Sequence, residues 1–219
     1  MLIAPSILNA NQLKLGEAIS QAAATGISRF HLDIMDGHFV PNLSYGPALV
    51  ADFKQSYPQL TAEVHLMSDV PETLVPAFVE AGADLLLLHY EAMPEANLLH
   101  WLDYLATEGV KAGLVLNPKT DVAVLTKFAP KVAQVLLMTV FPGFGGQRFL
   151  KDAPARITAA RQLLDQFNPA VQLEVDGGID ATTAAQCRQA GAEIFVAGSF
   201  IFKKGPIANQ IQQLAQAIR

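Results

Sequence analysis

Four side chains that can bind a metal ion occur in three short apolar segments: His31, Asp33, His65 and Asp176. Side chains alternate across a β-strand, so His31 and Asp33 share one face of their segment. Two imidazoles and two carboxylates suit zinc, iron(II), manganese or cobalt. Any one of these residues alone is more often structural. A buried ionised aspartate is costly without a cation, however, and these motifs contain no Arg or Lys, so we expect a divalent metal ion here.

Asp33 and Asp176 are also a candidate acid/base pair. If their segments are the second and seventh strands of an eight-stranded barrel, the two carboxylates approach the barrel axis from roughly opposite sides. One carboxylate can then remove a proton from one face of a planar intermediate while the other returns a proton to the opposite face, which inverts a carbon centre. A proton beside a ketone is weakly acidic, so the resulting enediolate needs stabilisation by a Lewis-acid metal.

Three glycine-rich segments follow predicted strands and are candidates for binding phosphate. Backbone N–H groups in such loops can hold a dianion without an arginine, and the loops after the last strands of α/β barrels often do so. A single glycine-rich loop is more often a tight turn, whereas three at the ends of adjacent strands favour a binding site. The candidates are Gly143, Phe144, Gly145, Gly146, Gly177, Gly178, Gly198 and Ser199.

The elements that must position these residues are short β-rich runs alternating with longer runs of helical period, which is typical of a parallel sheet with crossover helices. Strands are expected at residues 2–6, 28–35, 60–67, 84–89, 111–116, 134–140, 171–176 and 194–198. Helices are expected to end at Gly26, Gly82, Gly109 and Gly191, because glycine tolerates the left-handed conformation that closes a helix. Eight strands without a linker predict an α/β fold, a single (β/α)8 TIM barrel with one domain over residues 1–219.

Composition excludes several classes of protein. The 219 residues are 51% hydrophobic and 16% charged, so the chain can bury a large core. Its net charge is −5 and its basic residues cluster no further than Lys203-Lys204, which argues against binding nucleic acid or an anionic membrane. No segment reaches membrane-spanning length. Cys187 is the only cysteine, which excludes an internal disulfide and favours the reducing cytoplasm.

Further residues are expected near the same end of the barrel. Ser6 ends the first predicted strand and either bonds a substrate hydroxyl or caps the following helix. Three methionines on inward faces either fill the core or exclude water from the reactive intermediate: Met35, Met67 and Met138. One layer below, we expect an ion-paired cluster of Glu63, Lys111 and Glu174. The remaining histidines are expected to be structural or solvent-facing: His38, His89 and His100.

Together these motifs resemble the ribulose-phosphate 3-epimerase family over nearly the whole chain. The segments that carry the resemblance are 3–8, 31–42, 64–67, 116–118, 142–147, 174–178 and 196–199. The resemblance implies a (β/α)8 barrel that interconverts D-ribulose 5-phosphate and D-xylulose 5-phosphate. It also implies one divalent metal ion per subunit, with zinc preferred to iron, manganese or cobalt, and a homo-oligomer without nucleic-acid or membrane partners.

The same resemblance assigns roles to individual residues. The metal ligands would be His31, Asp33, His65 and Asp176. In one direction of the reaction Asp33 would accept the proton and Asp176 would donate it. The substrate contacts would be Ser6, His65, Gly143, Phe144, Gly145, Gly146, Gly177, Gly178, Gly198 and Ser199.

The chain departs from the family pattern at two positions. Phe141 stands where many members have a polar residue, and Glu63 stands where a shorter aspartate is usual. Two alternative functions stay open. One is a hexulose 6-phosphate 3-epimerase, such as one acting on allulose 6-phosphate, whose additional carbon must fit under the loop that contains Phe141. The other is a phosphate-binding barrel without catalysis.

Overall fold

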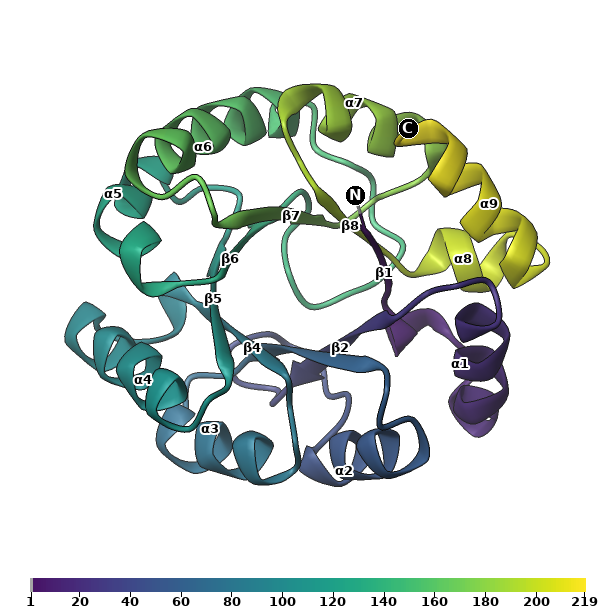
Figure 1. Ribbon diagram of the computed structural model, residues 1–219, viewed down its shortest axis with the longest axis horizontal. Helices are drawn as coiled ribbons and strands as arrows, with labels where there is room; N and C mark the ends of the chain where they lie inside the picture. The colour runs from purple at the N-terminus through teal and green to yellow at the C-terminus, as the bar shows by residue number, and fades with distance from the viewer. Residues whose placement is uncertain (1) are drawn as a thin grey trace.

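The computed structural model describes residues 2–219, which form a barrel of eight parallel strands surrounded by helices (Figure 1). The strands pair in the order β1-β8-β7-β6-β5-β4-β3-β2. Their bounds are β1 (Leu2–Pro5), β2 (Arg29–Met35), β3 (Thr61–Met67), β4 (Leu85–His89), β5 (Lys111–Leu116), β6 (Gln134–Met138), β7 (Gln172–Asp176) and β8 (Ile194–Ala197). The predicted (β/α)8 TIM barrel is confirmed.

The barrel closes between β1 and β2. A parallel bridge between Ser6 and His31 joins these two strands. On its other side, the backbone N–H of Ser6 donates to the carbonyl oxygen of Ala197 at the end of β8, at 3.1 Å. The closing seam of the barrel therefore passes directly beside the first predicted metal ligand.

The two faces of the strands explain why the helices lie outside. Phe30, Leu32 and Ile34 of β2 face outward into the main apolar core, where the Phe30 ring meets Phe53 of the helix at Pro47–Ser56 with a centroid separation of 5.7 Å. The inward faces pack against one another, as Leu87 does in a second apolar cluster. The α-helices are α1 (Leu15–Ala23), α2 (Pro47–Ser56), α3 (Pro71–Glu80), α4 (Glu95–Thr107), α5 (Leu125–Phe128), α6 (Ala153–Phe167), α7 (Ala181–Ala190), α8 (Ser199–Lys203) and α9 (Ile207–Ala217).

Short 3-10 helices interrupt several loops: η1 (Ile7–Asn9), η2 (Gln12–Lys14), η3 (Tyr90–Ala92), η4 (Val122–Val124) and η5 (Ala129–Lys131). The four glycines predicted to end helices all have positive φ, between 72° and 110°. Most strand bounds agree with the prediction within one residue, but β6 ends two residues early, at Met138. The next residue, Thr139, still bonds to the end of β7, because its backbone N–H donates to the carbonyl oxygen of Asp176 and its hydroxyl lies 2.8 and 2.6 Å from the carbonyl oxygens of Asp176 and Gly177.

The loops at the carboxyl ends of the strands carry the candidate site. The longest of them, residues 36–46 after β2 and 139–152 after β6, both reach this end of the barrel. Asn42 of the first loop donates from Nδ2 to the carbonyl oxygen of Gly143 in the second, at 2.8 Å. Within residues 2–219, no helix has both the length and the apolar character needed to span a membrane.

Candidate metal centre and active site

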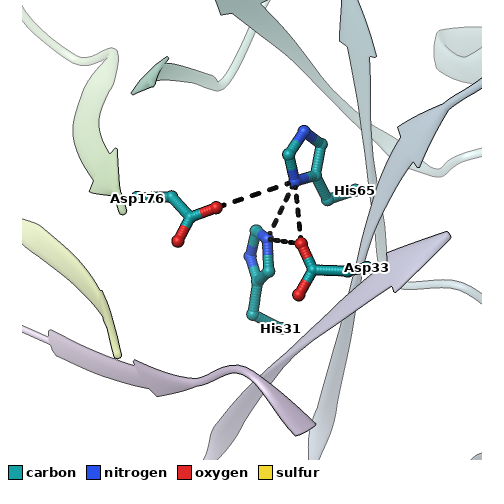
Figure 2. A group of neighbouring side chains, drawn as sticks. All are labelled: His31, Asp33, His65 and Asp176. Carbon is teal, nitrogen blue, oxygen red and sulfur yellow. Dashed lines mark hydrogen bonds and ion pairs between the residues drawn. The ribbon is translucent and has the colours of Figure 1, made fainter. Parts of the chain in front are cut away.

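The four predicted metal ligands converge at the carboxyl end of the barrel (Figure 2). His31 Nε2 lies 3.1 Å from His65 Nδ1 and 3.4 Å from Asp33 Oδ1. His65 Nδ1 lies 3.2 Å from Asp33 Oδ1 and 4.0 Å from Asp176 Oδ2. Figure 2 shows Asp33 and Asp176 reaching the two imidazoles from opposite sides. Strands β2, β3 and β7 thus bring one donor atom from each residue to a common point.

His31 turns its Nε2 towards this point. Its Nδ1 lies 2.8 Å from Glu63 Oε1, and Glu63 also accepts bonds from Arg29 and Gln134. Burial tends to raise the pKa of Glu63, but its contacts with His31 and the nearby Arg29 hold that pKa at about 2, so Nδ1 donates to an ionised carboxylate. Burial tends to lower the pKa of His31, but Asp33 and Glu63 raise it well above its usual value. A metal ion at this point would therefore replace the proton on Nε2.

His65 is also oriented by a partner behind it. Its Nε2 lies 2.8 Å from His89 Nε2, and His89 Nδ1 lies 3.2 Å from Glu91 Oε2. Burial lowers the pKa of His65 to about 4 and also lowers the pKa of His89. Both rings are therefore neutral near pH 7. His89 is fully buried and structural, not solvent-facing, whereas His38 and His100 are exposed.

The donor set fits a divalent cation. In a tetrahedral site with metal–ligand bonds of about 2.0–2.1 Å, neighbouring donor atoms lie about 3.3 Å apart. The measured separations among His31 Nε2, Asp33 Oδ1 and His65 Nδ1 are 3.1–3.4 Å. Two imidazole nitrogens facing each other beside two carboxylates are the mixed nitrogen and oxygen set that suits zinc and its neighbours.

The polar cluster below the site differs from the prediction. Glu63 and Glu174 are buried there, but Lys111 is exposed, so its predicted place in the cluster is wrong. Lys111 is the first residue of β5, where a long side chain can reach solvent.

Arg29, which the sequence reasoning missed, pairs with Glu63 at 2.9 Å instead. Gln134 Nε2 bridges the carboxylates of Glu63 and Glu174, at 3.0 and 2.6 Å. Arg29 therefore pairs with Glu63 in this lower layer and not with the metal-facing carboxylates Asp33 and Asp176.

Asp33 and Asp176 differ in their affinity for a proton. Burial tends to raise the pKa of Asp33, but the charge and hydrogen bond of His31 and a hydrogen bond with His65 hold it well below its usual value. Ser6 adds a 2.6 Å bond from its hydroxyl to Asp33 Oδ2 and does not cap η1, so the capping alternative for Ser6 is wrong and the substrate-binding alternative stays a prediction. Burial and then the negative charge of Asp33 raise the pKa of Asp176 to about 7. Such a pair has one carboxylate that stays ionised and one that holds a proton.

A cavity opens above these carboxylates. Asp33 and Asp176 line it, together with Ser6 and all the predicted glycine-rich residues: Gly143, Phe144, Gly145, Gly146, Gly177, Gly178, Gly198 and Ser199. The predicted methionines also line it: Met35, Met67 and Met138. Of the predicted substrate contacts, His65 is the exception among the described residues, since it is fully buried and does not line the cavity.

The cavity contains one polar side chain that the sequence reasoning missed. Asn9 is 8% exposed and lines the cavity, and its amide makes no hydrogen bond to any residue of 2–219. Side chains larger than hydrogen would collide with it, because a Cβ on Gly145 or Gly198 would lie 2.1 or 2.8 Å from Asn9 Nδ2. The two glycines thus leave room for the amide. A signal was available, since the loop after the first strand belongs to the same rim as the other loops.

The loop after β6 covers one side of the cavity. Phe141 and Phe144 are half exposed there, and Gln147 Nε2 donates to both of their carbonyl oxygens, at 2.6 and 2.8 Å. Lys119 lies over the Phe141 ring, with its Nζ 5.6 Å from the ring centroid. Phe141, which stands where many family members have a polar residue, therefore places an aromatic ring at the cavity wall. The cationic side chain of Lys119, from the loop after β5, holds this ring in place.

Known proteins with similar sequences share one description. A model of the "Ribulose-phosphate 3 epimerase family" matches residues 2–202. The "Ribulose-phosphate 3-epimerase" of Chlamydia muridarum is 43% identical over 209 residues, which cover 94% of this chain and 90% of that protein. Its namesake in Bacillus subtilis is 39% identical and covers 97% of both chains. The chloroplastic "Ribulose-5-phosphate-3-epimerase" of Arabidopsis thaliana is 37% identical over 100% of this chain and 78% of that protein.

Solved structures with similar folds include other barrels that are distant in sequence. A 3-hexulose-6-phosphate synthase superposes with a TM-score of 0.76 at 18% identity, over 100% of both chains. A 3-keto-L-gulonate-6-phosphate decarboxylase from Vibrio cholerae superposes with a TM-score of 0.74 at 14% identity, over 99% of this chain and 96% of that one. At these identities the similarity shows the fold alone.

Proposed function

This chain belongs to the ribulose-phosphate 3-epimerase family, and we propose that it moves the C3 proton of D-ribulose 5-phosphate by means of two carboxylates, Asp33 and Asp176. The product would be D-xylulose 5-phosphate. The chain is accordingly an enzyme acting on a sugar phosphate, which leaves no support for the alternative of a barrel without catalysis.

The single observation that carries this mechanism is the placement of Asp33 and Asp176 on opposite sides of the imidazole pair (Figure 2). Inversion at C3 needs a proton to leave one face of the carbon and another to arrive at the opposite face. A planar intermediate lying between the two carboxylates gives each of them access to one face. Neither group has to move between the two halves of the reaction.

The difference in proton affinity favours one starting state. With the pKa of Asp33 well below its usual value and that of Asp176 near 7, Asp33 begins ionised and Asp176 can begin protonated. Asp33 then accepts the C3 proton while Asp176 donates its own to the other face. In the reverse direction the two residues exchange these roles, as microscopic reversibility requires.

His31, Asp33, His65 and Asp176 would hold a divalent metal ion, for which zinc is the first candidate and iron, manganese or cobalt are alternatives. Such an ion supplies positive charge where the enediolate becomes negative. The protein surrounds this region with Met35, Met67 and Met138, which line the cavity and are almost fully buried. These side chains exclude water and so protect the intermediate from stray protonation.

The far end of the cavity suits the phosphate group. Gly143–Gly146, Gly177, Gly178, Gly198 and Ser199 offer backbone N–H groups on adjacent loops, and glycine permits close approach of a ligand to the backbone. The Asn9 amide lies among them without another partner in residues 2–219. We assign this end to the phosphate and the end at Asp33 and Asp176 to C3. A homo-oligomer remains our expectation for the state in solution.

Solvent exchange tests the proposal directly. Incubation of the zinc-loaded enzyme with D-ribulose 5-phosphate in D2O is expected to give D-xylulose 5-phosphate with deuterium at C3. Product that forms without deuterium at C3 would contradict proton transfer through these carboxylates. Comparison of kcat/KM for pentulose 5-phosphates and for allulose 6-phosphate would show whether the cavity beside Phe141 accepts a sixth carbon.

A further inference from the structure

The buried pair His89 and Glu91, behind the metal-facing His65, takes no part in the proton transfers at C3. We propose that Glu91 and His89 are positioning residues that fix the proton of His65 on Nε2, a proposal that rests on the proposed role of His65 as a metal ligand. The Nδ1 lone pair of His65 is then directed permanently at the cation. The two hydrogen bonds that link these residues have directions set by the surrounding donors and acceptors.

The protonation of Glu91 decides which atom is the donor in its hydrogen bond with His89. Its Oε1 accepts the backbone N–H of Asn117 at 2.8 Å and the hydroxyl of Thr120. Its Oε2 lies 3.2 Å from His89 Nδ1. Although burial tends to raise the pKa of Glu91, its hydrogen bonds with His89 and Thr120 lower it, so the group is an ionised, acceptor-only carboxylate. His89 must therefore carry its proton on Nδ1.

The proton position of His89 in turn decides the donor in its hydrogen bond with His65. A neutral imidazole has one donor and one acceptor, so a His89 protonated on Nδ1 can only accept at Nε2. The partner atom, His65 Nε2, is 2.8 Å away and must be the donor. The ring planes differ by 25° and the centroids lie 5.0 Å apart, although the two nitrogens are only 2.8 Å apart. The rings therefore meet edge to edge, as an in-plane hydrogen bond requires.

The anchor of this chain of bonds is itself rigid. Arg156 of α6 donates to the carbonyl oxygens of Asn117 and Thr120, both at 2.9 Å, and to that of Met138 at 3.4 Å. These bonds tie the loop after β5 to α6 and to the end of β6. Glu91 is thus held by a loop that cannot shift without breaking them. His31 has a separate acceptor in Glu63, so each metal-facing imidazole has its own fixed proton.

Glu91→Gln is a sharp test because it changes no heavy-atom position by design. The backbone N–H of Asn117 can only donate, so the glutamine oxygen must take the place of Oε1 and its NH2 group must face His89 Nδ1. Each hydrogen bond then reverses. His89 carries its proton on Nε2, His65 accepts at Nε2, and the proton of His65 moves to Nδ1, where it opposes a cation.

A second pair of variants separates hydrogen bonding from charge. His89→Gln keeps an acceptor oxygen within reach of His65 Nε2, whereas His89→Leu has a similar volume and no acceptor. Both keep the charge of Glu91. Glu95→Gln on α4 removes one negative charge at an exposed ion pair with Lys127 and serves as the control for Glu91→Gln. Circular dichroism and thermal melting establish that each variant is folded.

The readouts are cobalt(II) affinity, from competition with a chelator, and the histidine 15N spectrum of the metal-free protein. We expect Glu91→Gln and His89→Leu to bind cobalt about 10- to 100-fold more weakly, with His89→Gln and Glu95→Gln close to the parent. The 15N spectrum should show His89 protonated on Nδ1 in the parent and on Nε2 in Glu91→Gln. Cobalt affinity of Glu91→Gln within twofold of the parent would overturn the proposal and leave the two-carboxylate mechanism standing. Failure of the parent protein to bind cobalt or zinc would overturn this proposal together with the proposed metal site.

Discussion

The Ser6 hydroxyl donates a 2.6 Å hydrogen bond to Oδ2 of Asp33, across the seam at which β1 and β2 close the barrel. Both residues are almost fully buried. The bond supports the ionised form of Asp33 and fixes the direction of its carboxylate. One contact therefore links closure of the barrel to the proposed proton acceptor.

Replacement of Ser6 by alanine should weaken catalysis and stability together. Loss of a buried hydrogen bond to a carboxylate is expected to lower the free energy of unfolding by about 1–3 kcal/mol. We expect kcat/KM for D-ribulose 5-phosphate to fall about tenfold, since Asp33 loses a fixed orientation. Urea denaturation and steady-state kinetics measure the two effects. Ser56→Ala, at an exposed position at the end of α2, should change neither, and a Ser6→Ala protein with full activity would contradict this role.

Replacement of Asp176 by asparagine should separate the two halves of the reaction. We expect turnover to fall about 100- to 10,000-fold in both directions, with the fold intact, because one face of the substrate loses its proton carrier. Asp33 keeps its function, so the epimer whose C3 proton faces Asp33 should still exchange that proton with D2O. Mass spectrometry of recovered substrate measures this exchange. Turnover within a few-fold of the parent would refute the two-carboxylate mechanism.

Asn9 offers a test of the phosphate end that leaves the carboxylates untouched. Asn9→Asp has the same shape but adds a negative charge in a cavity assigned to a dianion, so the two repel each other. The KM for D-ribulose 5-phosphate should rise at least about tenfold, while turnover of unphosphorylated D-ribulose should barely change. Inhibition by inorganic phosphate should weaken in parallel. An equal loss on both substrates would place Asn9 outside the phosphate site.

Removal of the metal should destabilise the folded protein. An ion that binds the native state and not the unfolded chain adds about 2.7 kcal/mol at a concentration 100 times its Kd. For a chain of this length, treatment with EDTA should thus lower Tm by about 5–10 °C, and zinc should restore it. Differential scanning calorimetry measures the shift. His65→Ala should bind less metal by elemental analysis and should melt at nearly the same temperature with or without EDTA.

Cys187 should report on unfolding. Burial in α7 raises the pKa of its thiol to about 12, so the reactive thiolate is scarce in the native protein at pH 8. We expect a disulfide reagent to label Cys187 slowly in buffer and at the rate of global unfolding in urea. Because the unfolded thiol ionises near pH 9 and the native thiol does not, this group lowers stability as the pH rises from 9 towards 12. Rapid labelling of the native protein at pH 8 would contradict burial of the thiol.

The sequence predicted side-chain positions best on the β-strands, where side chains alternate strictly between the two faces. His31 and Asp33 could be placed on one face because side chains alternate along a strand, and the same period placed Met35 beside them. The period also puts Arg29 on that face, so its pairing with Glu63 was available to sequence reasoning. Lys111 also follows this alternation, but it is the first residue of β5 and is exposed. A long charged side chain at a strand end can reach water, which costs less free energy than its burial.

Other features depend on contacts between segments distant in the sequence. The approach of Asn9 to Gly145 and Gly198 depends on loop conformations that no local pattern specifies. The edge-to-edge contact of His65 with His89 requires the register between β3 and β4, in which His65 stands opposite Leu87. A register shift of one residue would turn His89 to the other face of the sheet.

The pairing of β1 with β8 joins residues 2–5 to residues 194–197, so the two partners are separated by almost the whole length of the chain. During synthesis the first strand leaves the ribosome long before its neighbour on that side exists. The ring is complete, and Ser6 is fixed between Ala197 and His31, only after β8 has been translated. A nascent chain that stops short of residue 194 therefore lacks the strand that completes the barrel and cannot assemble the whole candidate site.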